Sequence, residues 1–118
     1  MVYDDVDIRD LAENPESFTG RQVSITGWVS HIEQGGSGCL IHLEVPVPDG
    51  FPGQSLGLVA KFGGDISHVS LGCHIVIKGR CEGIQVLTME GCCGIVVVPL
   101  IEASVVEGPL EIERPSRV

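Results

Sequence analysis

One stretch of the sequence, residues 22–33, constrains the fold more than any other. Val23, Ile25 and Val29 stand at alternate positions, and hydroxyl-bearing residues and the single tryptophan lie between them. Alternation of β-branched residues with period two predicts a strand that buries one face. Gly27 takes one of the inward positions, and a glycine inside a strand marks a bulge or a sharp bend. We therefore predict a long bent strand that is shared by the two halves of a closed sheet.

Shorter alternating runs follow this strand. They predict further strands at 39–45, 56–62, 73–80 and 84–90, and another extended run at 95–98. Residues 46–55 are rich in proline and glycine, so we expect a surface loop between the second and third strands. Glu82 and Gly83 are interpreted as a tight turn that separates the fourth strand from the fifth.

Two segments have features of short helices. An apolar stripe at positions i, i+3 and i+4 predicts a helix over residues 7–14, which ends before Pro15. Asp65 is a candidate N-cap for one or two helical turns over residues 66–71, between the third and fourth strands.

The order of these elements indicates the fold class. A helix, three strands, a short helix and two or more strands describe an OB-fold, an all-β, five-stranded Greek-key barrel. An SH3-like barrel is the main alternative, but it usually lacks a helical segment before its last strands. We divide the chain into an N-terminal helix and lead-in (1–21), the barrel (22–101) and a C-terminal tail (102–118).

Two motifs support this interpretation through a resemblance. Residues 14–29, NPESFTGRQVSITGWV, resemble the NPxxFxGKxVxVxGxV opening of tRNA-anti-like OB-fold domains. Leu71 and Gly72, followed by VIKGRCEG at 76–83, resemble the LxxGxxVxVxGxCxG segment of that family. The resemblance implies a five-stranded OB barrel of the type found in small, mostly uncharacterised bacterial proteins, and its name associates it with nucleic-acid binding. The long loop at 46–55 and the apolar run at 95–101 depart from the pattern.

The charge of the chain limits the ligands it can attract. Sixteen acidic residues against seven basic ones give a net charge of −9. Residues 1–20 carry six acids and one base, so most of the excess lies in the N-terminal segment. This balance argues against a basic DNA-binding module, although it leaves room for a small local site. No apolar run reaches the roughly 18 residues of a membrane-spanning helix, and we expect no membrane partner.

The five cysteines, at positions 39, 73, 81, 92 and 93, show no CxxC pair. We interpret them as reduced residues, mostly of the core, because the strong zinc signature is absent. We expect a cytoplasmic location, since free cysteines fit a reducing compartment and the acidic first residues do not resemble a secretory signal.

An OB barrel that binds a single strand needs stacking rings and basic side chains on one face. The candidate ligand-binding residues are Trp28, His42, Phe51, Lys61, Lys78 and Arg80. The competing interpretation of the tryptophan is structural, with its ring packed under the N-terminal helix against Leu11.

The sequence does not indicate a catalytic or metal site. Its four histidines, at positions 31, 42, 68 and 74, show no zinc-ligand spacing. No local signature of an activated nucleophile and no GxxxxGK[ST] phosphate loop is found. We therefore predict a protein that is not an enzyme and uses no cofactor or metal.

Two functions follow from these observations. The first is a non-catalytic binding module for a single-stranded nucleic acid or another oligomeric ligand. The alternative is a protein-interaction or self-assembly module that binds no nucleic acid. That alternative rests on the net charge and on the apolar run 95–101, which could pair with a partner strand or with a second copy of the chain.

Overall fold

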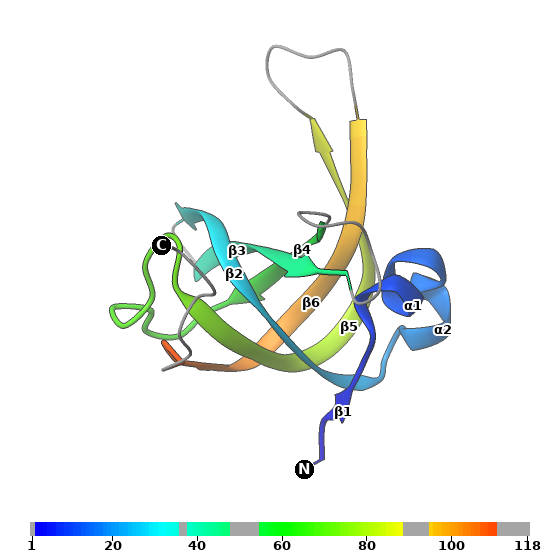
Figure 1. The fold of residues 1–118 in the computed structure, drawn as a ribbon, viewed down its shortest axis with the longest axis horizontal. Coiled ribbons are helices and arrows are strands. Elements are labelled where there is room, and N and C mark those ends of the chain that lie inside the picture. Colours follow the sequence, from blue (N-terminus) through cyan, green and yellow to red (C-terminus); the bar gives the residue numbers. More distant parts are fainter. Residues whose placement is uncertain (1, 36–37, 48–54, 89–94, 111–118) are drawn as a thin grey trace, which may run out of the picture.

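The structure, a computed structural model, describes residues 2–35, 38–47, 55–88 and 95–110. Two short helices and six strands make up this part of the chain. They are β1 (Asp4–Asp5), α1 (Ile8–Glu13), α2 (Pro15–Phe18), β2 (Gln22–Gly35), β3 (Gly38–Pro46), β4 (Ser55–Phe62), β5 (His74–Thr88) and β6 (Ile95–Glu107). Figure 1 shows the strands curling into a barrel, with α1 and α2 at one side. None of the helices in these residues has the length and apolar character needed to cross a membrane.

The sheet is closed. Its strands follow the order β1-β2-β3-β4-β6-β5, and β5 pairs back onto β2. The strands β4 and β6 pair in parallel, whereas the other pairs around the barrel are antiparallel. Five strands therefore form a continuous wall, and β1 adds a short parallel pairing at the start of β2. The predicted five-stranded barrel with a short N-terminal helix is confirmed.

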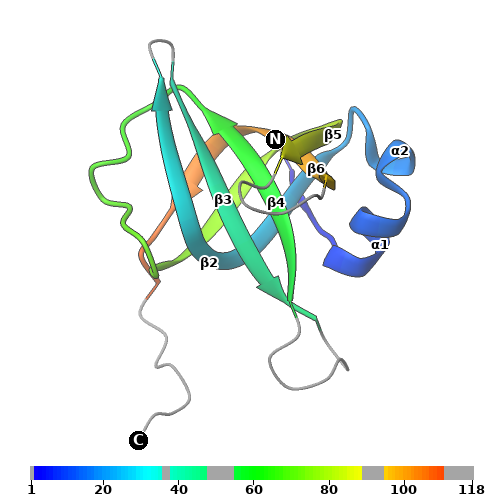
Figure 2. The ribbon, with the colours of Figure 1, turned by 90° about the horizontal axis from the view of Figure 1, so that it is seen from above.

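The long strand β2 is shared by the two halves of the barrel, as predicted. Residues 22–28 pair with β5, and residues 28–35 pair with β3. A Cβ atom on Gly27 would lie 2.9 Å from the carbonyl oxygen of Glu44, so the backbones of β2 and β3 approach closely where β2 changes partner. Figure 2 shows the resulting sweep of β2, from α2 on one side to the β2–β3 hairpin on the other.

The core consists of aliphatic side chains from every strand of the barrel, joined by Ile8 and Leu11 of α1. In β3, for example, the four inward residues predicted from the alternation are all buried, namely Cys39, Ile41, Leu43 and Val45. The N-cap of helix α1 is Asp7, whose side chain accepts a hydrogen bond of 2.8 Å from the backbone N–H of Arg9. Its two buried residues then pack α1 against β4 and β6.

The predicted helix over residues 66–71 is wrong, because the described chain between β4 and β5 forms turns. The carboxylate of Asp65 accepts two hydrogen bonds of 3.0 Å from Ser67, one from the backbone and one from the hydroxyl. Further along, the N–H of Gly72 donates to the carbonyl oxygen of Val29 on the neighbouring strand β2. These side-chain and long-range bonds satisfy the backbone in place of a helical ladder.

The predicted turn at Glu82 and Gly83 is also wrong. The strand β5 continues through them to Thr88, and the register against β6 shifts between Cys81 and Gly83. Gly83 has φ +107°, a conformation that glycine adopts readily and that suits a bulge as well as a turn. The fifth strand of the barrel is therefore β6, not residues 84–90, and it ends at Glu107, beyond the expected barrel limit at 101.

Because β5 and β6 are so long, their far ends leave the barrel as a two-stranded ribbon. We call residues 83–88 and 95–100 the arm; they pair with each other from Gly83 opposite Leu100 to Thr88 opposite Ile95. At the base of the arm, Leu100 also pairs with Val59 of β4. Figure 1 shows the arm rising from the barrel, past α1 and α2 and away from β1.

Candidate functional site

A bulge in β2 places two rings on the outer face of the barrel. Trp28 and His31 are three residues apart, so in a regular strand they would point to opposite faces. The register against β3 shifts between Val29 and His31, and Val29 stays buried. The extra residue, Ser30, donates its hydroxyl to the carbonyl oxygen of His42 at 3.1 Å. The bulge thus gives Trp28 and His31 successive outward positions.

Each of these rings meets a second ring from a neighbouring strand. Trp28 stacks on His74 of β5, with ring centroids 4.0 Å apart and an angle of 17° between the planes. His31 meets His42 of β3 edge-on, with centroids 5.1 Å apart. The four rings follow the outer side of β2, and we call them the ring track.

One member of the ring track is held in place by a carboxylate. The Nε2 atom of His42 lies 2.8 Å from Oε2 of Glu33, and the side chain of His42 is only 15% exposed. His31 beside it is exposed. Within the second ring pair, His31 is therefore the more accessible surface for a ligand.

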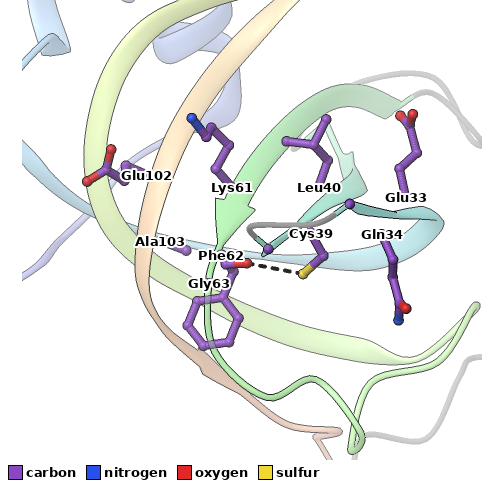
Figure 3. Close-up of a pocket in the computed structure, with 11 residues that line it drawn as sticks. Glu33, Gln34, Cys39, Leu40, Lys61, Phe62, Gly63, Glu102 and Ala103 are labelled. Atoms are coloured by element: carbon purple, nitrogen blue, oxygen red, sulfur yellow. Dashed lines mark hydrogen bonds between the residues drawn. The ribbon is translucent and has the colours of Figure 1, made fainter.

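A hollow of about 570 Å³ lies at the β2–β3 hairpin, next to the end of the ring track. It is lined by Glu33, Gln34, Gly35, Gly38, Cys39, Leu40, Lys61, Phe62, Gly63, Glu102 and Ala103. Figure 3 shows Glu33, Leu40 and Lys61 pointing to one side and the ring of Phe62 to the other. The hollow thus offers one ammonium group beside apolar surface and carboxylates.

The thiol of Cys39 in this hollow is not an activated nucleophile. It donates a hydrogen bond to the carbonyl oxygen of Phe62, with Sγ and O 3.3 Å apart. Burial raises the pKa of the Cys39 thiol, because a thiolate there would lose hydration. The group therefore stays protonated near neutral pH.

Most of the basic side chains are already paired with carboxylates. The Nε atom of Arg80 donates to Glu82 at 2.6 Å, and this bond raises the pKa of the Arg80 guanidinium. A second carboxylate, that of Glu102, lies 3.7 Å from the same guanidinium. Lys78 pairs with Glu107 at 3.3 Å. Within the described ranges, Lys61 is the basic side chain that makes no salt bridge.

The structure separates the predicted ligand-binding residues. Trp28 and His42 belong to the ring track, and Lys61 lies in the hollow. Lys78 and Arg80 lie on β5, tied to acidic residues, and Phe51 lies outside the described residues.

The alternative placement of Trp28 is wrong. Its ring stacks on His74 on the outer face of the barrel, whereas Leu11 is fully buried in the core. Sequence reasoning also missed His31 and His74 as members of the site. The signal for His74 was its outward position in the alternation of 73–80, whereas His31 became visible only with the bulge.

In the part of the chain that the structure describes, no group of three or more His, Cys, Asp or Glu side chains is arranged to hold a metal ion. His68, for example, lies away from the ring track and bonds through Nε2 to the carbonyl oxygen of Val106 at 3.2 Å.

The sequence matches no known protein-family model and no curated protein. The fold, however, is similar to that of a small single-stranded DNA-binding protein from Streptomyces coelicolor, known from a crystal structure. The TM-score is 0.52 at 13% identity, over 75% of this chain and 94% of that chain. This chain is an OB-fold-like barrel. At such low identity the similarity shows the fold alone and assigns no family, so the tRNA-anti-like motifs remain a resemblance.

Proposed function

We propose that this protein is a non-catalytic OB-fold binding module that holds a single-stranded nucleic acid along the ring track, mainly through the bases. The observation that carries the proposal is the line of four rings on the outer side of β2. OB-folds bind oligonucleotides on the face of their second and third strands and at the hairpin between the first two. In this barrel those elements are β3, β4 and the β2–β3 hairpin, which the ring track and the hollow adjoin.

Stacking supplies the affinity in this proposal. A base stacked on an aromatic ring typically contributes about 1–3 kcal/mol, and it does so for every base type. Trp28 is stiffened by its stack on His74, so little side-chain freedom is lost when a base binds beside it. The similarity in fold to a single-stranded DNA-binding protein supports the choice of ligand.

The charges of the described residues predict that the affinity for nucleic acid depends only weakly on the salt concentration. A single strand releases about 0.7 counterions for each phosphate that a basic side chain neutralises. Lys61 is the basic side chain without a carboxylate partner in the described residues, so one phosphate contact is expected. The logarithm of the affinity should then fall with the logarithm of the salt concentration with a slope near −0.7.

The test is a titration with an oligothymidylate of about 12 nucleotides, within the usual range of site sizes for OB-folds. Quenching of Trp28, the single tryptophan, reports binding by the native protein. Fluorescence anisotropy of a labelled oligonucleotide reports binding by the variants. The His31→Ala variant should weaken binding at least about fivefold, which corresponds to the loss of one stacked base.

Two lysine variants complete the design. Lys61→Ala should flatten the salt dependence, whereas Lys78→Ala, which removes a lysine that is already paired, serves as the matched control. If both variants lost the same amount of affinity and of salt dependence, the attraction would be nonspecific. That result would contradict a phosphate contact at Lys61. Absence of binding tighter than about 100 µM at low salt would remove nucleic acid as the ligand.

A further inference from the structure

We infer that Glu44 makes the ring track selective for guanine, by accepting two hydrogen bonds from the edge of a base stacked on Trp28. The inference rests on the proposed function, because it names the base that the same site prefers. Stacking supplies affinity toward every base type, whereas a hydrogen bond to a base edge distinguishes one base from another.

Glu44 lies beside the indole of Trp28 on the outer face of the barrel. The two residues are partners in the β2–β3 register, and the next pair, Val29 and Leu43, is buried on the inner face. Partners in an antiparallel pair share one face, with Cβ atoms typically about 4.5–5.5 Å apart. The pair precedes the bulge, so the register there is regular. The carboxylate of Glu44 is therefore within reach of a ligand bound at Trp28.

His74 determines on which side of Trp28 a base can stack. The strand β2 has β5 on one side and β3 on the other. His74 of β5 stacks on the indole with centroids 4.0 Å apart, so it occupies the ring face turned toward β5. A base that adds to this stack lies on the β3 side, over Glu44. The next residue in that row is Gly57 of β4, which has no side chain to fill the same space.

The carboxylate of Glu44 is open to a ligand. The residue is exposed, and among the described residues its carboxylate makes neither a salt bridge nor a hydrogen bond. At the other end of the ring track, by contrast, the carboxylate of Glu33 is bonded to His42 at 2.8 Å. Glu44 thus brings an unused acceptor to the position where a base stacks.

The chemistry of a carboxylate selects among the bases. An ionised carboxylate only accepts hydrogen bonds, and its two oxygens suit a pair of parallel donors. The Watson–Crick edge of guanine presents two adjacent donors, the N1–H and the 2-amino group. Cytosine and adenine present one amino group beside an acceptor nitrogen, whereas thymine and uracil present one N–H between two carbonyl oxygens. Guanine therefore fits Glu44 best, and thymine or uracil fits it worst.

The test compares two oligothymidylates of about 12 nucleotides, one with a single central deoxyguanosine and one with deoxyinosine at that position. Inosine keeps the N1–H but lacks the 2-amino group, so the two ligands differ in one donor. Measured by fluorescence anisotropy with the native chain, the guanine ligand should bind at least about fivefold more tightly, which is the level of discrimination typical of a bidentate contact. Equal affinities of the two ligands would overturn the inference.

The variant Glu44→Gln tests whether this residue causes the preference. It keeps the size of the side chain, but its amide offers an acceptor oxygen beside a donor, so the difference between guanine and inosine should fall below about twofold. Binding of plain oligothymidylate should not weaken, because the variant removes a negative charge near the phosphates. Glu13→Gln, on α1, removes the same charge away from the ring track and should leave the preference unchanged.

The possible failures are distinguishable. If the preference survives in Glu44→Gln, or if this variant loses affinity for plain oligothymidylate as much as for the guanine ligand, the assignment to Glu44 is wrong. If oligothymidylate binds to the native chain and guanine adds nothing, the guanine preference is wrong and the proposed function stands. If no oligonucleotide binds, the proposed function fails and the inference fails with it.

Discussion

The same two strands have different surroundings in the barrel and in the arm. In the barrel, β5 pairs with β2 on one edge and β6 on the other, and Ile77 and Ile101 are fully buried. In the arm, the described residues of β5 and β6 pair with each other, and Ile84 and Val97 are about half exposed. Both regions are aliphatic, so composition alone does not distinguish them. What differs is the number of layers and strands around each side chain.

The two regions differ in how much of their aliphatic surface is buried. The barrel buries its aliphatic residues and thereby fixes the outer face that carries the ring track. The arm carries residues of the same type but leaves Ile84, Val86 and Val97 about half exposed, so truncating one of them removes less buried apolar surface. A substitution should therefore lower the free energy of unfolding more in the barrel than in the arm.

The largest expected effect comes from truncating one isoleucine in each region. Ile77→Ala removes a fully buried side chain from the barrel and should lower the free energy of unfolding by about 2–5 kcal/mol. Ile84→Ala, on the same strand but half exposed, should change it by no more than about 0.5 kcal/mol. Urea unfolding of both variants measures the two values. Similar losses would show that the arm folds as part of the core.

Two glycines test how closely the barrel strands approach. Gly27→Ala would place a Cβ atom 2.9 Å from the carbonyl oxygen of Glu44, a backbone atom that cannot rotate away. We expect a loss of about 1–3 kcal/mol in the free energy of unfolding, as is typical of overpacking. In Gly57→Ala, near the arm, the new atom would meet nothing nearer than Val98, at 3.7 Å. Thermal unfolding of the two variants measures this difference in stability. Equal unfolding midpoints would contradict the close approach of β2 and β3.

The outcome for Gly27 illustrates what could be predicted from the sequence. The alternation over 22–33 and the inward glycine are local features, and they led to the bent strand, the closed barrel and the buried faces. The N-terminal helix was predicted for the same reason, because its apolar stripe lies within a few residues. Local patterns suffice where burial and backbone geometry favour the same conformation.

The remaining features depend on partners that are distant in the sequence. Gly83 suits a turn or a bulge equally well, and only the pairing of β5 with β6 makes it a bulge. In place of a helix over 66–71, Ser67 bonds to Asp65, and Gly72, just beyond the segment, bonds to the carbonyl oxygen of Val29 on β2. The ring track requires the shift in register after Val29, which interrupts the period of two on which the prediction relied.

The smallest expected effect concerns the salt bridge between Lys78 and Glu107, which joins β5 to β6 within the barrel at 3.3 Å. Both side chains are partly exposed, so water screens the pair, and a double-mutant cycle should give a coupling of about 0.2–1 kcal/mol. Lys61→Ala, which removes a lysine with no salt bridge to a described residue, provides the baseline for losing a surface lysine. A coupling as large as the loss in Ile77→Ala would mean that ion pairs, and not aliphatic burial, hold β5 and β6 together in the barrel.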